Sequence, residues 1–321
     1  MENNSQSSRP LVGISACLHG QAVRFNGEHK RDAFIVDSLG QYFDFKSWCP
    51  EVGIGLGVPR PTLRLVGKPN AFRVVGVKDA SIDVTDDLRR WSRNAADSMS
   101  GLCGYIFKKD SPSCGMERVK VYPHKTGAAS KKAVGVFADE VMKRYPTLPT
   151  EEEGRLKDPI LRENFVNRVY VRHRWQSLVV DGMSPSALIE FHTRHKYLVM
   201  SHSVSGYKRL GQMLSNLKAG DLDSIAGDYF SELMQVLKQR ATRKSHVNTL
   251  QHLVGYLKKR IGSDDKREIL DSIARYRRFE IPLIVPMTLL HHYFRVNPDE
   301  YIARQIYLQP SPSRLGLRNA I

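Results

Sequence analysis

The sequence predicts an α/β N-terminal domain with a small, mostly parallel sheet, followed by an all-α C-terminal domain. Three observations support this expectation. The 321 residues suffice for two ordinary domains, short β-branched runs alternate with helical periods up to about residue 160, and almost no strand pattern follows. We therefore expect a disordered leader at 1–10, an α/β domain at 11–160 and an all-helical accessory domain at 161–321.

Runs of β-branched and small residues mark the strands of the first domain. Residues 11–18 predict a strand that ends at a turn, and a second short run at 22–27 closes with an Asn-Gly turn. Helical spacing occupies 31–39, and 45–61 is typical of a strand that leads into an extended loop. The loops of such a sheet gather at one edge, where ligands usually bind. Further expected elements are strands at 72–77 and 101–109, helices at 83–99 and 134–146, and an acidic, Pro-rich connector at 146–159.

The second half consists of successive amphipathic helical periods. Ser184 and Pro185 supply an N-cap and a first-turn proline, and Ser263 with Asp264 is expected to open a later helix in the same way. The final residues, 309–321, predict a loop or tail. The expected helices are 163–179, 184–201, 206–217, 222–239, 242–260, 263–279 and 286–296.

The composition is that of a globular protein, with 41% hydrophobic and 26% charged residues. No apolar run reaches the roughly 18 residues of a membrane span, and the first residues lack a secretory segment, so we expect a cytoplasmic protein without membrane contact. The net charge of +16 favours an anionic substrate or a polyanionic partner. After residue 150 there are 27 Lys and Arg and 18 Asp and Glu, so the excess of positive charge is spread over both halves of the chain. Such a distribution is typical of a solvated basic surface.

Four cysteines in a cytoplasmic chain favour buried, catalytic or metal-bound thiols over disulfides. No CxxC pair is present, which argues against a structural zinc site. Cys17, Cys49 and Cys114 each fall in a loop rich in Gly, Pro or Ser, where backbone can approach a cofactor closely. They could instead be small buried hydrophobes, as we expect for Cys103 inside its apolar strand. Glu51 is either a solvated loop carboxylate or a general acid or base beside a bound substrate.

Three stretches, ISACLHGQAVRFNG, WCPEVGIGLGVPRP and KKDSPSCG, resemble in this order the signature blocks of the thiouracil desulfurase (TudS) family. The resemblance extends over roughly residues 11–160. It implies a 4Fe-4S cluster whose ligands are Cys17, Cys49 and Cys114. Three thiolates leave one iron open, and a soft metal with an open position favours a soft donor such as a thiocarbonyl sulfur.

The same resemblance implies catalytic roles for Glu51 and Ser111. Water activated by Glu51 would attack the thiocarbonyl carbon of 2-thiouracil or a related thiolated base, nucleoside or nucleotide, in a non-redox reaction that releases sulfide. Ser111 would orient the substrate or relay a proton. Asn26 departs from the Asp that members of the family often carry at this position.

In the helical half, the stretch FHTRHKYLVMSHSVSGYKRLG resembles an uncharacterised domain that is often fused to this desulfurase. Its histidines and basic residues could form a metal or phosphate site, although ordinary packing of the imidazoles is the simpler interpretation. The residues concerned are His192, His195, His202, Lys196, Lys208 and Arg209.

Three functional hypotheses follow from these patterns. The chain is a desulfurase for a small thiolated pyrimidine, or a cluster-containing nucleic-acid-binding or redox-sensing protein, as its net charge and basic helices would allow. In the third hypothesis the helical domain contacts a nucleotide or RNA and presents it to the first domain. The sequence does not predict the oligomeric state.

Overall fold

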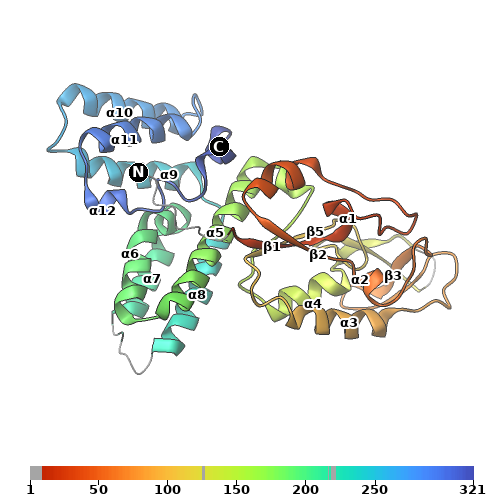
Figure 1. The fold of residues 1–321 in the computed structure, drawn as a ribbon. Helices are drawn as coiled ribbons and strands as arrows, with labels where there is room; N and C mark the ends of the chain where they lie inside the picture. Colours follow the sequence, from red (N-terminus) through yellow and green to blue (C-terminus); the bar gives the residue numbers. More distant parts are fainter. Residues whose placement is uncertain (1–8, 125–126, 216, 218–221) are drawn as a thin grey trace. The chain divides into compact units, whose positions relative to one another are not determined.

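The computed structural model describes residues 9–124, 127–215, 217 and 222–321, so the leader expected at 1–10 lies almost entirely outside the described residues. The chain divides into two compact units, Met1–Lys157 and Asp158–Ile321 (Figure 1). The first unit combines strands with helices, and the second is predominantly helical, which confirms the predicted fold class.

Four parallel strands form one sheet of the first unit, in the order β2-β1-β5-β8. Their registers bring the carboxyl ends level, because Ser15 pairs with Trp48 and Phe107 pairs with Glu152. The segments that follow the strands therefore leave the sheet along the same edge. The strands are β1 (Leu11–Ser15), β2 (Asp44–Trp48), β5 (Gly104–Phe107) and β8 (Thr150–Glu152).

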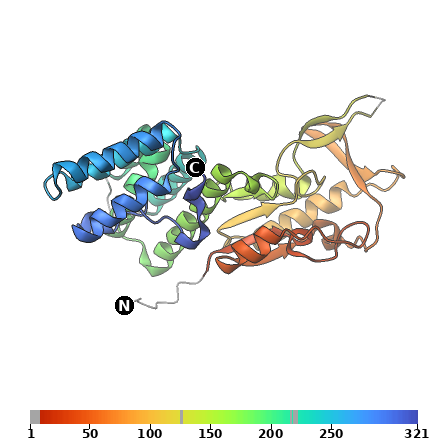
Figure 2. The same cartoon turned by 90° about the horizontal axis from the view of Figure 1, so that it is seen from above.

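A second sheet has the order β4-β3-β6-β7, with β3 and β6 parallel and the outer pairs antiparallel. The sequence predicts only β4 among these strands. The β6–β7 hairpin projects at the edge of the unit (Figure 2). Its strands carry exposed lysines and lack the apolar run by which a strand is predicted from sequence. The strands are β3 (Leu63–Lys68), β4 (Ala71–Gly76), β6 (Val119–Tyr122) and β7 (Ser130–Ala133).

Two expectations for this unit were wrong, those for 22–27 and 146–159. Residues 22–27 contain no strand, because Val23 and Phe25 line a cavity instead of joining a sheet. The helical spacing at 31–39 corresponds to a π-helical turn, Phe34–Ser38, followed by a 3-10 turn, Leu39–Gln41. The connector at 146–159 contains the strand β8. Its acidic side chains are buried and hydrogen-bonded, whereas those of a loop would be exposed.

The helices of the first unit pack on an aromatic core beside the parallel sheet. The rings of Tyr105 and Phe107 stack with centroids 4.2 Å apart, and Phe137 of α4 meets both of them edge-on. The α-helices are α1 (Ala16–His19), α2 (Pro50–Gly53), α3 (Thr85–Asp97) and α4 (Val136–Arg144), and a 3-10 turn spans Arg155–Lys157.

The second unit has its own hydrophobic core among helices α5 to α11. Ser184 caps α6 by accepting the N–H of Ala187, as predicted, whereas Gly262 and not Ser263 is the N-cap of α10. No helix in the described part of the chain is long and apolar enough to cross a membrane. The helices are α5 (Pro159–Gly182), α6 (Pro185–His202), α7 (Val204–Leu214), α8 (Leu222–Lys238), α9 (Arg243–Leu257), α10 (Ser263–Arg277), α11 (Ile284–Val296) and α12 (Glu300–Ala303), with 3-10 turns at Ser313–Leu315 and Leu317–Asn319.

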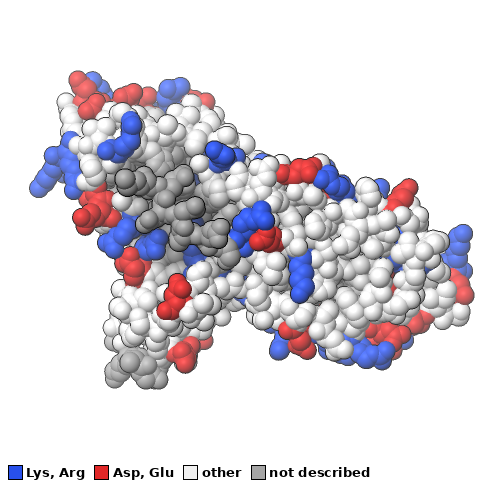
Figure 3. Space-filling model, in the orientation of Figure 1, with Lys and Arg blue, Asp and Glu red and all other residues white. Residues whose placement is uncertain are grey.

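The charged side chains of both signs are interspersed on the molecular face drawn in Figure 3. Many of the basic groups form ion pairs with neighbouring carboxylates, for example Arg209 with Glu232 at 2.7 Å and Arg267 with Asp264 at 2.7 Å. This face therefore has the mixed surface expected of a solvated basic protein.

Candidate active site

A cavity of about 400 Å³ opens where the strands of the parallel sheet end. Cys17 lies just beyond β1 and Cys49 just beyond β2, while Ser111 and Cys114 belong to the loop that follows β5. These four residues and Glu51 all line this one cavity. The structure thus brings together every residue to which the sequence assigns a chemical role in the first unit.

The loop that carries Ser111 and Cys114 is held against the start of α4. Backbone N–H groups in the first turn of α4 donate to the carbonyls of Pro112 and Ser113 at 3.1 and 2.9 Å. This approach requires Gly135, because an added Cβ would lie 2.6 Å from the Ser113 carbonyl. The Ser111 Oγ accepts the N–H groups of Ser113 and Cys114 at 3.2 and 3.0 Å. Both acceptor positions of this hydroxyl are filled, so its proton is the part that it can offer to a ligand.

Glu51 lies between a thiol and a guanidinium. Its Oε2 is 3.3 Å from the Sγ of Cys49 and 3.9 Å from Nη2 of Arg60. The side chains of Arg60 and Glu51 are only 8% and 13% exposed, which strengthens their attraction relative to a surface pair. The N–H of Arg60 donates to the carbonyl of Phe25 at 2.8 Å, which fixes the backbone of this segment.

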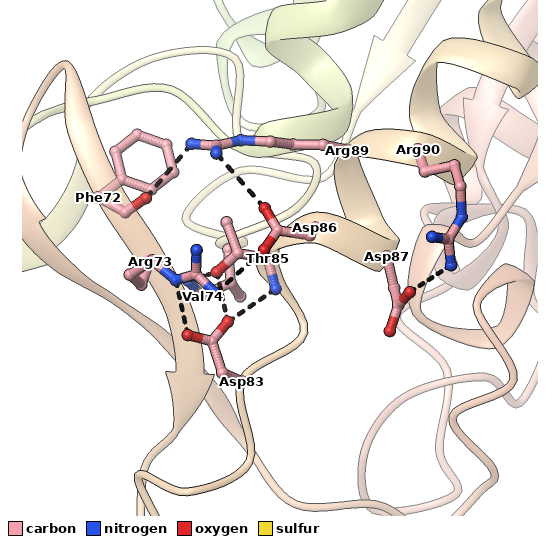
Figure 4. Close-up of polar contacts among 9 residues, drawn as sticks. All are labelled: Phe72, Arg73, Val74, Asp83, Thr85, Asp86, Asp87, Arg89 and Arg90. Carbon is pink, nitrogen blue, oxygen red and sulfur yellow. Dashed lines mark hydrogen bonds and ion pairs between the residues drawn. The ribbon is translucent and has the colours of Figure 1, made fainter.

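The short helix α2, which carries Glu51, rests on α3. Gly53 allows this contact, since an added Cβ would come within 2.5 Å of the indole nitrogen of Trp91. The start of α3 is itself tied to β4 (Figure 4), because the Thr85 hydroxyl accepts the N–H of Val74 at 2.7 Å and donates to Asp83 at 2.6 Å. The helix that carries Glu51 thus rests on a helix whose first residue is hydrogen-bonded to the second sheet.

All three cavity thiols are disfavoured as thiolates. Burial raises the pKa of Cys17, Cys49 and Cys114, and the carboxylate of Glu51 raises each of them further. For Cys49 the pKa rises to about 12. The thiols therefore hold their protons near neutral pH and release them when a metal takes their place.

The donor set of three thiols suits a soft metal rather than a hard one. No three His, Cys, Asp or Glu side chains among the described residues are close enough to share one metal ion. A four-iron cluster binds each thiolate through a different iron atom, so its ligands stand further apart. The described lining of the cavity includes neither a histidine nor a fourth cysteine. Cys103 lies outside this lining and is 1% exposed, as expected for a packed core residue.

The cavity also has a basic lining that sequence reasoning missed. Five cationic side chains line it beside the two carboxylates of Glu51 and Asp110. For Arg60, Lys108 and Lys109 the available signal was their position in the motif segments VPRP and KKD. Asn26 is not among the described lining residues, so the departure from the family pattern lies outside the cavity. The basic residues are Arg24, Lys30, Arg60, Lys108 and Lys109.

In the helical unit, the histidines singled out by the sequence bond to three different protein groups. Nδ1 of His192 lies 3.0 Å from the Tyr229 hydroxyl, and Nδ1 of His195 lies 2.7 Å from the carbonyl of its own helix at Phe191. Nδ1 of His202 lies 2.5 Å from a carbonyl that follows α8. Burial lowers the pKa of His192 to about 4, so this imidazole is neutral at pH 7. These contacts favour packing over a joint metal or phosphate site.

Comparison with known families finds two matches along the chain. Residues 12–153 match the family described as 2-thiouracil desulfurase, and residues 196–312 match the family described as Protein of unknown function (DUF1722). The resemblances expected from the sequence for the two halves are therefore confirmed.

Two individual relatives each match about half of the chain. Uncharacterized protein YbgA of Escherichia coli (strain K12) is 29% identical over 154 residues, which cover 48% of this chain and 91% of the relative. A solved structure, the 4Fe-4S-dependent thiouracil desulfidase TudS, is 27% identical with a TM-score of 0.38. That match covers 47% of this chain and 95% of the solved one.

Proposed function

We propose, from the premise that residues 12–153 belong to the 2-thiouracil desulfurase family, that the first unit hydrolyses the C=S bond of 2-thiouracil or a related thiolated pyrimidine. In the overall reaction the oxygen of water replaces sulfur and sulfide leaves, so no electron is gained or lost. The observation that supports this proposal is the convergence of Cys17, Cys49, Cys114 and Glu51 on one cavity.

The three thiols would hold a 4Fe-4S cluster. When bound through three thiolates, such a cluster supplies a Lewis-acidic iron with an open position, which a thiocarbonyl sulfur suits as a soft donor. Cys17 and Cys49 approach from the ends of neighbouring strands, and Cys114 approaches from the loop after β5. The three cysteines come from three separate segments of one cavity, and the rest of its lining would be available to the substrate.

Glu51 would accept the proton of the attacking water, and Ser111 would donate a hydrogen bond to the substrate. The carboxylate lies 3.3 Å from the Sγ of Cys49 and lines the cavity, where it could accept the proton of a water molecule. The Arg60 guanidinium keeps a positive charge beside this carboxylate. Ser111 can act only as a donor here, because backbone N–H groups occupy its oxygen.

The test compares Glu51→Gln with the wild type after anaerobic reconstitution with iron and sulfide. A general base contributes about 10²- to 10⁴-fold to a rate, so the variant should retain its iron and lose sulfide release from 2-thiouracil by about this factor. Asp110→Asn is the matched control, since Asp110 lines the same cavity and asparagine tolerates its positive φ of 60°. Cluster-loaded wild-type protein that leaves both 2-thiouracil and its nucleotide unchanged would overturn the proposal.

The basic lining of the cavity indicates that the substrate carries a negative charge. Five cationic side chains around one cavity favour an anionic group on the bound molecule, as in a thiolated pyrimidine nucleotide. If so, the KM for the 5′-monophosphate should be lower than that for the free base, and the difference should shrink as salt is added. Equal KM values at low salt would show that the free base alone accounts for recognition.

A further inference from the structure

Three consecutive glutamates at the end of the parallel sheet are linked to the segment that carries Ser111 and Cys114. Glu151 and Glu152 are the last residues of β8, and Glu153 follows directly. Glu151 and Glu152 are 3% and 6% exposed, and the Glu153 side chain is 11% exposed. Burying three adjacent carboxylates is costly unless each of them is paired or hydrogen-bonded.

Two of the three carboxylates are satisfied by groups at the ends of the loop after β5. Glu152 accepts the backbone N–H of Met116 at 2.8 Å, two residues after Cys114. Glu153 accepts the backbone N–H of Lys109 at 2.9 Å, two residues before Ser111, and forms an ion pair with the Lys108 ammonium. The two carboxylates therefore hold the loop from its downstream and upstream sides.

The register of the sheet makes this arrangement a consequence of the fold. Glu152 pairs with Phe107, the last residue of β5, so β8 ends beside the point where the loop begins. Glu151 adds a third link, because it pairs with Arg155, whose Nη1 lies 2.8 Å from Oε1 of Glu117.

We propose that Glu152 and Glu153 are positioning residues that fix the Ser111–Cys114 loop, and with it one thiol and one hydroxyl of the candidate active site. This inference rests on the proposed function only for the roles of Ser111 and Cys114. The hydrogen bonds from Met116 and Lys109 to Glu152 and Glu153, which we call the clamp, are a property of the folded chain. Without it, the loop would keep its attachment to α4 but would lose its anchors at Lys109 and Met116.

Amide hydrogen exchange of the metal-free full chain tests the clamp independently of activity. In Glu152→Ala the Met116 amide should exchange about ten-fold faster, and in Glu153→Ala the Lys109 amide should do so, because each loses a hydrogen bond to a charged acceptor. Glu152→Gln should restore slow exchange at Met116, since a side-chain amide oxygen still accepts an N–H. Glu140→Ala on α4 is the matched control, because this carboxylate accepts no hydrogen bond from the loop in the described part of the chain.

Reconstituted protein supplies the second measurement. Glu152→Ala should bind as much iron as the wild type and show a kcat lowered about ten-fold, with recovery in Glu152→Gln, because a small displacement of reacting groups is enough to slow chemistry. If Glu152→Ala does not fold, Glu152→Asp tests the same point by shortening the reach of the carboxylate.

Two results would overturn the inference. One is wild-type exchange at Met116 and Lys109 in the alanine variants. The other is equally faster exchange across the whole first unit, which would make the glutamates general contributors to stability. If the wild-type protein does not desulfurate pyrimidines, the exchange result still decides whether the clamp exists, so failure of the proposed function is distinguishable from failure of this inference.

Discussion

Replacing Gly53 with alanine should show whether the position of Glu51 depends on the contact between α2 and α3. The added Cβ would lie 2.1 Å from Cε2 of Trp91, where ordinary contact requires about 3.4 Å. Either the indole or the short helix must therefore move by about 1.3 Å. Trp91 itself packs against Phe137 with ring centroids 5.7 Å apart, so it has little room to withdraw.

Overpacking of this kind costs about 1 to 3 kcal/mol. For a domain of about 150 residues, each kcal/mol corresponds to a change of about 2 to 4 °C in Tm, so the first unit should melt about 2 to 12 °C lower. Thermal unfolding of the metal-free protein measures this change. Gly57→Ala is the matched control, because no atom lies within 4 Å of its added Cβ, and loss of glycine flexibility there should leave stability unchanged or slightly raised.

A smaller side chain at Trp91 should relieve the loss of stability caused by Gly53→Ala. Combining Gly53→Ala with Trp91→Leu should recover part of the lost stability, with a coupling energy of about 0.5 to 3 kcal/mol. Because α2 carries Glu51, kcat for sulfide release should fall in Gly53→Ala and should not fall in Gly57→Ala. A Gly53→Ala protein with wild-type Tm and wild-type kcat would refute the claim that α3 positions the carboxylate.

Two further predictions concern the cysteines. Cys114→Ala should lose reconstituted iron while Cys103→Ala keeps it, and equal iron in both variants, measured by absorption and metal analysis, would contradict the ligand assignment. Because burial raises the pKa of the Cys49 thiol from 9.0 to about 12, the folded metal-free state keeps a proton that the unfolded chain releases above pH 9, so its stability should fall as pH rises through this window. Chemical unfolding at several pH values measures this trend. The Cys49→Ser variant should show a weaker trend. A free energy of unfolding that stays constant from pH 9 to 11 would contradict the prediction.

Sequence reasoning succeeded where one pattern determines one element. Helical periodicity predicts α5 to α11, and each of these helices contributes apolar side chains to the core of the second unit. It failed where contacts distant in sequence override local composition. β8 is three residues long and acidic, and it exists because β5 supplies a parallel partner and the loop supplies hydrogen-bond donors to its glutamates.

The site shows the same division between local and distant information. The motif residues Cys49, Glu51 and Ser111 lie in recognisable local contexts, so the sequence alone could nominate them. Arg60 could not be assigned to Glu51 in this way, because their approach depends on how a loop containing two prolines folds back. Which groups line a cavity is thus less predictable than which groups belong to a motif.

Two of the three thiol-bearing segments are supported from different sides. The Cys49 turn rests on α3 through Gly53, and the Cys114 loop is anchored to α4 and to the glutamates of β8. None of these anchors involves a thiol. In small zinc domains the metal supplies much of the folding free energy, because no preformed site exists without it. Here the frame comes from two sheets and their helices, so the binding energy of a cluster held by Cys17, Cys49 and Cys114 would offset the cost of removing protons from thiols whose pKa is raised by burial.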